Sequence, residues 1–162
     1  ICKYTAMARA ACCINYGQRG DKGMSKRSGR CLCGSVSYEY SGPVNWSGHC
    51  HCESCRRNCS AAIVTFFGVP RSAYSFTGTE PDIFESSSGV RRLFCSRCGT
   101  PMAYDADRYP DEIHFYAASL IDPENFTPQF HVHCGEQLDW LKLADDLPKY
   151  EKNASSAVKN QD

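Results

Sequence analysis

Three groups of closely spaced cysteines are the residues of this sequence best suited to chemistry. They occur in the stretches RCLCG (Cys31 and Cys33), HCHCESC (Cys50, Cys52 and Cys55) and FCSRCG (Cys95 and Cys98). Thiolate sulfur is a preferred ligand of Zn²⁺, and cysteines separated by one or two residues are typical of metal sites. The residue types and their spacing therefore predict metal binding.

The first and third groups together predict one closed, structural site. In FCSRCG, two residues between the thiolates allow a tight turn, and Gly99 tolerates the unusual dihedral angles that follow. In RCLCG, residues i and i+2 of a strand share a face, so both thiols could bind one ion. Cys31, Cys33, Cys95 and Cys98 would then complete a tetrahedral Zn²⁺ site. Buried free cysteines are the alternative, and two pairs at ligand spacing argue against it.

The middle group supplies three ligands and predicts a site of another kind. Cys50 and Cys52 can share a strand face, and Cys55 returns about one helical turn later. Three protein ligands leave a fourth tetrahedral position for water or substrate, as in catalytic zinc sites. Cys59 is the candidate that could fill this position and close the site. Both an open and a closed second site follow from the sequence.

Basic residues follow the middle group directly. Arg56 and Arg57 could offset the negative charge of a three-thiolate site or bind the carboxylates of a thiol substrate. A solvated basic pair is the alternative interpretation. Arg91 and Arg92 are further candidates for carboxylate binding, and nothing in the sequence selects among the four.

Histidines and tryptophans near these groups have simpler interpretations. Alternation along a strand would point His49 and His51 to the face opposite Cys50 and Cys52. His131 is expected to be a partly buried structural histidine, and a role in the site is the alternative. Trp46 and Trp140 are expected to be core aromatics, and stacking on a ligand is the alternative.

The elements that must position these cysteines are mostly short strands. Residues 36–40 alternate between apolar and polar side chains, and residues 61–69 form a continuous apolar run typical of a buried strand. Residues 82–95 predict a hairpin with its turn at 87–89. Further strands are expected at 74–76, 112–120 and 128–133.

Helix signals are scarce. A short helical turn is expected from about Glu53. The one longer candidate is 135–148, where Leu138, Leu141 and Leu147 lie roughly on one face and Pro148 ends the pattern. The prediction is a mainly β domain with one C-terminal helix.

The chain divides into one domain and two tails. Residues 24–150 are expected to form the zinc-binding domain, with a polar C-terminal tail at 151–162. Residues 1–23 lack hydrophobic periodicity and are interpreted as a disordered extension or a non-native segment. Cys2, Cys12 and Cys13 are therefore not counted as ligands.

Composition excludes some functions and compartments. Eighteen basic and 18 acidic residues give a net charge of zero, which offers no general electrostatic case for nucleic-acid binding. No apolar run reaches the about 18 residues that a membrane-spanning helix needs. Twelve cysteines would suit a secreted disulfide scaffold, but clustered spacing without a secretion signal favours metal ligands and a cytoplasmic location.

The motifs resemble those of the glutathione-dependent formaldehyde-activating enzyme family, which also includes centromere protein V. The resemblance runs from about Gly29 to Tyr150 and is carried by GRCLCGSVSYEY, HCHCESCRR, SSSGVRRLFCSRCGTPMAYD, FYAASLIDP and FTPQFHVH. It implies a fold of coiled β-sheets similar to that of B-type methionine sulfoxide reductases, with two zinc ions. It also implies glutathione as the thiol bound at Cys50, Cys52 and Cys55.

The implied activity is a carbon–sulfur lyase reaction in reverse, joining glutathione with formaldehyde. This sequence departs from the family pattern after Arg56, where CRRNCSAA places Cys59 and Ser60 near an expected glycine. A non-catalytic zinc-stabilised module that binds or senses a thiol or a metal is therefore the second hypothesis. A nucleic-acid role is the third, and the neutral charge argues against it.

Overall fold

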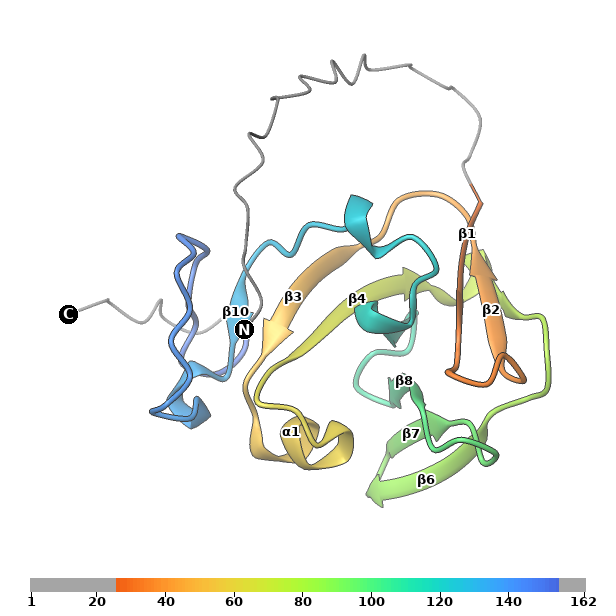
Figure 1. Ribbon diagram of the computed structural model, residues 1–162, viewed down its shortest axis with the longest axis horizontal. Coiled ribbons are helices and arrows are strands. Elements are labelled where there is room, and N and C mark those ends of the chain that lie inside the picture. The colour runs from red at the N-terminus through yellow and green to blue at the C-terminus, as the bar shows by residue number, and fades with distance from the viewer. Residues whose placement is uncertain (1–25, 155–162) are drawn as a thin grey trace, which may run out of the picture.

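The computed structural model describes residues 26–154, which form a mainly β domain as predicted (Figure 1). The extension expected at 1–23 lies outside the described residues, and so does the tail from residue 155 onward. The strands form a three-stranded and a seven-stranded sheet. No helix in residues 26–154 is long and apolar enough to cross a membrane.

The small sheet contains strands in the order β1, β2, β5 and is antiparallel throughout. Its strands are β1 (Arg27–Arg30), β2 (Ser37–Tyr40) and β5 (Tyr74–Phe76). Val36, Tyr38 and Tyr40 are buried and alternate with more exposed neighbours, as the sequence predicts. This apolar face covers one side of the large sheet, where the Tyr38 and Phe115 rings stack with centroids 4.0 Å apart.

The large sheet packs against a core cluster on each of its two faces. In spatial order its strands are β10 (His131–Val132), β3 (Trp46–Cys50), β4 (Val64–Pro70), β9 (Glu112–Tyr116), β8 (Pro101–Ala106), β7 (Val90–Phe94) and β6 (Asp82–Ser87). Strand β4 packs Phe67 and Val69 against the small sheet, whereas Val64 and Phe66 face a second core cluster around Cys50 and Cys55. Burial on both faces explains the continuous apolar run of this strand.

The predicted hairpin forms from β6 and β7. Gly89 occupies its turn with φ +68°. Strand β6 is the last strand of the large sheet and is exposed along its length. The part of the chain that the structure describes also contains four short 3₁₀ segments, η1 (Arg71–Ala73), η2 (Ala117–Ser119), η3 (Pro123–Asn125) and η4 (Cys134–Glu136).

The helix expected at 135–148 does not form. Within residues 26–154, the α-helix is α1 (Glu53–Cys59), and 135–148 holds only the end of η4, a turn at 139–140 and chain without regular secondary structure. The backbone at the end of this segment pairs with β10 instead: His131 N–H donates to the Pro148 carbonyl, and Tyr150 N–H donates to the His131 carbonyl. Sheet hydrogen bonds thus replace the helical ones that the leucine spacing suggests.

Candidate metal centres and the adjoining pocket

The four cysteines of the first and third groups converge at one end of the small sheet. Cys31, Cys33, Cys95 and Cys98 place their sulfur atoms within 4.8 Å of one another. Cys33 Sγ lies 3.5 Å from Cys31 Sγ and 3.8 Å from Cys95 Sγ. Tetrahedral Zn²⁺ with Zn–S bonds of about 2.3 Å separates its sulfurs by about 3.8 Å, so this group fits the ion.

The four thiols come from two turns rather than from a turn and a strand. The sequence placed Cys31 and Cys33 on a strand, but β1 ends at Arg30 and both lie in the turn toward β2. In this turn Gly34 adopts φ +78° and donates its N–H to the Cys31 carbonyl. In the second turn Gly99, at φ +74°, donates to the Cys95 carbonyl at 2.7 Å, as expected for a zinc knuckle.

The three cysteines of the middle group form a second centre at the junction of β3 and α1. Cys50 is the last residue of β3, Cys52 caps α1, and Cys55 lies in its first turn. Cys52 Sγ accepts the Cys55 N–H at 3.4 Å. Their three sulfurs also lie within 4.8 Å of one another, so this group fits a tetrahedral ion with one position left over.

Hydrogen bonds among the three thiols distribute their charge unevenly. Bonds from Cys50 and Cys55 lower the pKa of Cys52 far below its ordinary value. The bonds with Cys52 and Cys55, together with burial, raise the pKa of Cys50. A bound cation would favour ionisation of all three thiols.

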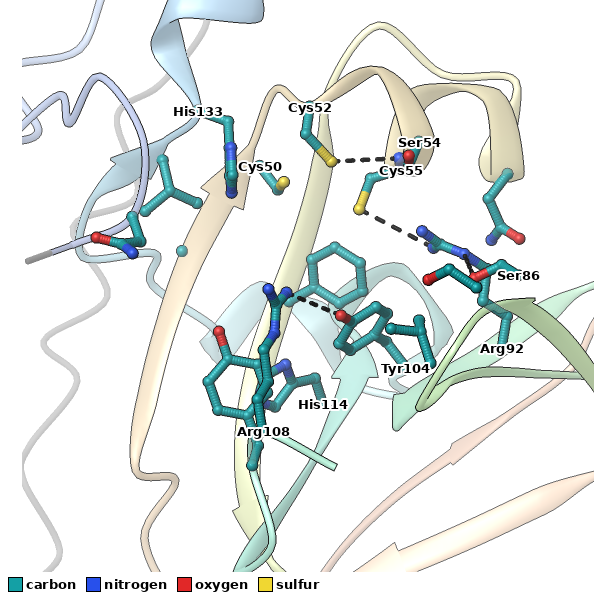
Figure 2. Close-up of a pocket in the computed structure, with 18 of the residues that line it drawn as sticks. Cys50, Cys52, Ser54, Cys55, Ser86, Arg92, Tyr104, Arg108, His114 and His133 are labelled. Carbon is teal, nitrogen blue, oxygen red and sulfur yellow. Dashed lines mark hydrogen bonds between the residues drawn. The ribbon is translucent and has the colours of Figure 1, made fainter. Parts of the chain in front are cut away.

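Arg92 is the cation nearest to this centre. Its side chain is 6% exposed, its Nη1 lies 4.0 Å from Cys55 Sγ, and its Nε donates to Ser86 Oγ at 3.2 Å. Figure 2 shows Arg92 and Ser86 reaching the cysteines from the β6–β7 hairpin. Of the four arginine candidates, the fold brings Arg92 to the thiols. No local pattern in the sequence singles out Arg92.

The other three arginines have different surroundings. Arg56 donates to the backbone carbonyls of His51 and Glu136 and does not line the pocket described below. Arg57 lines that pocket. Its guanidinium is exposed and pairs with the Glu53 carboxylate at 2.7 Å. Arg91 binds Asp105 and Asp107.

Cys59 is not part of the three-cysteine centre. It ends α1, half-buried, and accepts a hydrogen bond from Asn58 Nδ2 at 3.6 Å. Burial raises the pKa of its thiol. It lines a smaller pocket between α1 and η2, which the middle cysteines do not reach. Cys59 is therefore poorly placed to serve as the fourth ligand that the spacing allows.

His49 and His51, which flank Cys50 in the sequence, make their side-chain contacts away from the thiols. His49 Nδ1 lies 2.8 Å from Thr65 Oγ1, and His51 Nε2 lies 2.9 Å from His131 Nδ1. Both His51 and His131 are fully buried, and Asp145 lies 3.0 Å from His131 Nε2. Strand alternation predicts this arrangement for His49 and His51, and His131 is buried more completely than expected.

A pocket of about 970 Å³ opens directly on the three cysteines (Figure 2). Arg92 and Ser86 flank them on one side, and His133 lies beside Cys50 on the other. Aromatic side chains, among them Trp46 and Tyr104, continue the wall away from the sulfurs. Trp46 thus faces the pocket, and Trp140 is 70% exposed rather than part of the core.

Three further residues that line the pocket could not be predicted from the sequence. Ser86, Tyr104 and Arg108 come from β6, β8 and the loop after β8, and Arg108 Nη2 donates to the Tyr104 hydroxyl at 2.8 Å. None of them is close in the sequence to the three cysteines of the middle group. Only the pairing of β7 with both β6 and β8 brings these residues to the site.

The chain is similar to known proteins. Residues 26–136 match the family model of the glutathione-dependent formaldehyde-activating enzyme. An uncharacterized lyase of Schizosaccharomyces pombe is 29% identical over 108 residues, which cover 65% of this chain and 78% of that protein. A putative glutathione-dependent formaldehyde-activating enzyme of Halomonas elongata is 25% identical over 125 residues, covering 71% of this chain and 79% of the relative.

A similar fold has been solved. The crystal structure of a Rhodobacter sphaeroides protein matches with a TM-score of 0.50 and 20% identity, over 62% of this chain and 91% of that one. At this identity the match supports the fold alone.

Proposed function

The chain belongs to the glutathione-dependent formaldehyde-activating enzyme family, and we propose that it is a zinc-dependent carbon–sulfur lyase that joins glutathione with formaldehyde or another small aldehyde. The observation that carries the proposal is the convergence of Cys50, Cys52 and Cys55 at the head of a large pocket, with a buried arginine beside them. A purely structural metal site needs neither a pocket nor a nearby cation.

The reaction needs no oxidant or reductant. The sulfur of the thiol forms a bond to the carbonyl carbon, the carbon–oxygen π bond opens, and the thiol proton ends on the oxygen. Because the thiolate is the nucleophile, the site must favour the ionised thiol at neutral pH. It must also hold the thiol and the aldehyde close together, which contributes through proximity.

Cys50, Cys52 and Cys55 would hold the catalytic Zn²⁺, and Cys31, Cys33, Cys95 and Cys98 would hold a structural one. When bound, zinc supplies Lewis-acid stabilisation that lowers the pKa of a coordinating thiol. Four thiolates close the structural site, whereas three protein ligands leave a position for a substrate thiol.

Arg92 would offset the negative charge that gathers at this centre. Three thiolates on one divalent ion carry a formal charge of −1, and a substrate thiolate would add another. The Arg92 guanidinium is buried next to Cys55 and held by Ser86, so it acts where the effective dielectric constant is low.

Exposed cations at the pocket rim would bind the two carboxylates of glutathione. Arg57 and Arg108 both line the pocket, are exposed, and can donate further hydrogen bonds to an anionic ligand. Arg57 is thus the better placed member of the sequence-predicted pair, since Arg56 is engaged with backbone carbonyls.

The test follows exchange between glutathione, formaldehyde and S-hydroxymethylglutathione by NMR, because the uncatalysed reaction is appreciable. Zinc-loaded protein should accelerate exchange above this background, and Cys52→Ser should abolish the acceleration. Cys59→Ser, which changes a thiol outside the centre, is the matched control and should retain it. Full acceleration by the Cys52→Ser variant would refute the role of the centre.

A further inference from the structure

One wall of the pocket is built from aromatic rings. Six residues form this wall: Trp46, Phe66, Tyr104, Tyr109, His114 and Phe130. Phe66 and Tyr104 belong to the same apolar cluster as Cys50 and Cys55, so the wall begins at the sulfurs. In Figure 2, Tyr104 and His114 lie below the cysteines, on a different side from Arg92 and Ser86.

The rings of the wall contact one another in sequence. Phe66 and Tyr104 meet edge to face with centroids 6.4 Å apart, and Tyr104 stacks on His114 at 5.6 Å. Tyr109 and Trp46 each approach His114 at 4.6 Å. These distances are those of aromatic pairs that stabilise one another, so the wall is an ordered surface.

The Trp46 indole, His114 Nε2 and the Tyr104 hydroxyl already have hydrogen-bond partners within the protein. Glu112 accepts hydrogen bonds from Asn45, from the Trp46 indole at 2.9 Å and from His114 at 2.8 Å. These bonds outweigh its burial and hold the pKa of Glu112 below its ordinary value. The Tyr104 hydroxyl accepts from Arg108. What remains for a ligand is mainly ring surface.

Two glycines make room for the rings. A Cβ at Gly48 would lie 2.5 Å from the Phe130 ring, and a Cβ at Gly68 would lie 2.5 Å from the Trp46 indole nitrogen. Because both glycines sit in the strands beneath the wall, these two rings lie directly against the backbone of β3 and β4. Larger residues there would push the rings into the pocket.

Formaldehyde is too small to cover the aromatic wall. The pocket of about 970 Å³ is at the upper end of the about 300–1,000 Å³ typical of ligand sites, and formaldehyde contributes one carbon to the adduct. Glutathione is polar and suits the cationic side formed by Arg57 and Arg92. Its adduct with formaldehyde would leave the aromatic wall in contact with water, although burying such apolar surface is favourable.

We infer that the aldehyde partner of this chain carries an aromatic group, which binds against the wall formed by Trp46, Phe66, Tyr104, Tyr109, His114 and Phe130. This inference rests on the proposed function and names its substrate class. The thiol sulfur bonds to the aldehyde carbon, the carbon–oxygen π bond opens and the proton goes to the oxygen, giving a hemithioacetal that bears the aromatic group.

The test measures binding of stable product analogues to the zinc-loaded protein. Trp140→Phe leaves Trp46 as the single tryptophan, so its fluorescence reports on the wall directly. S-benzylglutathione should bind at least about tenfold more tightly than S-methylglutathione, because the ring buries apolar surface and stacks. S-hexylglutathione should bind more weakly than the benzyl conjugate, since its flexible chain loses more entropy on binding.

Variants locate the effect. In the same background, Tyr109→Ala should lower the benzyl-to-methyl preference by about fivefold. Tyr74→Ala changes another half-buried tyrosine, which packs on Phe115 outside the pocket, and should leave the preference unchanged. Circular dichroism of both variants confirms that they are folded.

The outcomes separate this inference from the proposed function. Equal affinity for the methyl and benzyl conjugates would overturn the aromatic substrate class while leaving the glutathione site intact. A hexyl conjugate that binds as tightly as the benzyl conjugate, or an unchanged preference in Tyr109→Ala, would also overturn it. If neither glutathione nor any conjugate binds, both the proposed function and the inference fail.

Discussion

The guanidinium of Arg92 lies 4.0 Å from the sulfur of Cys55, and both side chains are buried. Arg92→Gln removes the charge at the centre while keeping a polar side chain of similar reach. We expect kcat/KM for glutathione to fall by about tenfold or more, in line with the loss of one buried charge-assisted contact. Steady-state kinetics at several glutathione concentrations measure this change.

Arg91→Gln is the matched control for that variant. Arg91 is the neighbouring residue on β7, but it binds Asp105 and Asp107 and does not line the pocket. The Arg91→Gln substitution should lower the free energy of unfolding and leave kcat/KM close to that of the wild type. Arg92→Lys should restore part of the lost activity, since it restores the charge. An equal loss in Arg91→Gln and Arg92→Gln would indicate a structural cause instead.

The two cysteine groups should differ in what they contribute to stability. Cys98→Ser should lower the zinc content from two ions to one and leave the protein largely unfolded. A structural zinc site contributes about 10–16 kcal/mol, which is comparable to the whole stability of a domain, about 5–15 kcal/mol. Cys52→Ser should also lose one ion but remain folded. Metal analysis combined with thermal unfolding distinguishes the two, and a fully folded Cys98→Ser protein with two ions would contradict the assignment.

Cys59 should not be needed for either metal. Its thiol lines a different pocket from the middle cysteines, so Cys59→Ala should keep two zinc ions per chain and its response to glutathione. Loss of the second ion in Cys59→Ala would mean that Cys59 closes the centre. The non-catalytic binding or sensing module would then become the better hypothesis.

The free energy of unfolding should fall as the pH drops below about 6.5. Burial lowers the pKa of His114, so the unfolded chain takes up a proton at this position before the folded one does. Its stabilising contribution is therefore complete above pH 6.5 and is lost as the pH falls through the folded-state pKa. His114→Gln should make urea unfolding less dependent on pH between 7.5 and 5. His49 and His51, whose pKa values burial also lowers, would keep part of the slope. An unchanged slope in the variant would contradict the assignment.

The local patterns of the sequence were sufficient for several of the strands and for the grouping of the cysteines. Alternation at 36–40, the apolar run at 61–69 and the turn glycine at position 89 each depend on one segment and its burial. Ligand spacing likewise separates the four-cysteine group from the three-cysteine group. In both cases neighbours along the chain determine the outcome.

Features that depend on distant contacts could not be predicted. Leu138, Leu141 and Leu147 have helical spacing, but the backbone that follows them pairs with β10, and no helix forms. Arg91 and Arg92 are adjacent and chemically identical, and only the tertiary fold brings one of them to Cys55. The aromatic wall likewise combines residues from β3, β4, β8 and β9 that share no motif.

The open fourth position at Cys50, Cys52 and Cys55 is the central claim, and cobalt substitution tests it most directly. The visible spectrum of the cobalt-loaded protein should contain ligand-field bands from two centres, and titration with glutathione should change the bands of only one. The same titration of Cys52→Ser should show no change. Two four-thiolate spectra that glutathione does not alter would contradict the claim and assign both centres to structure.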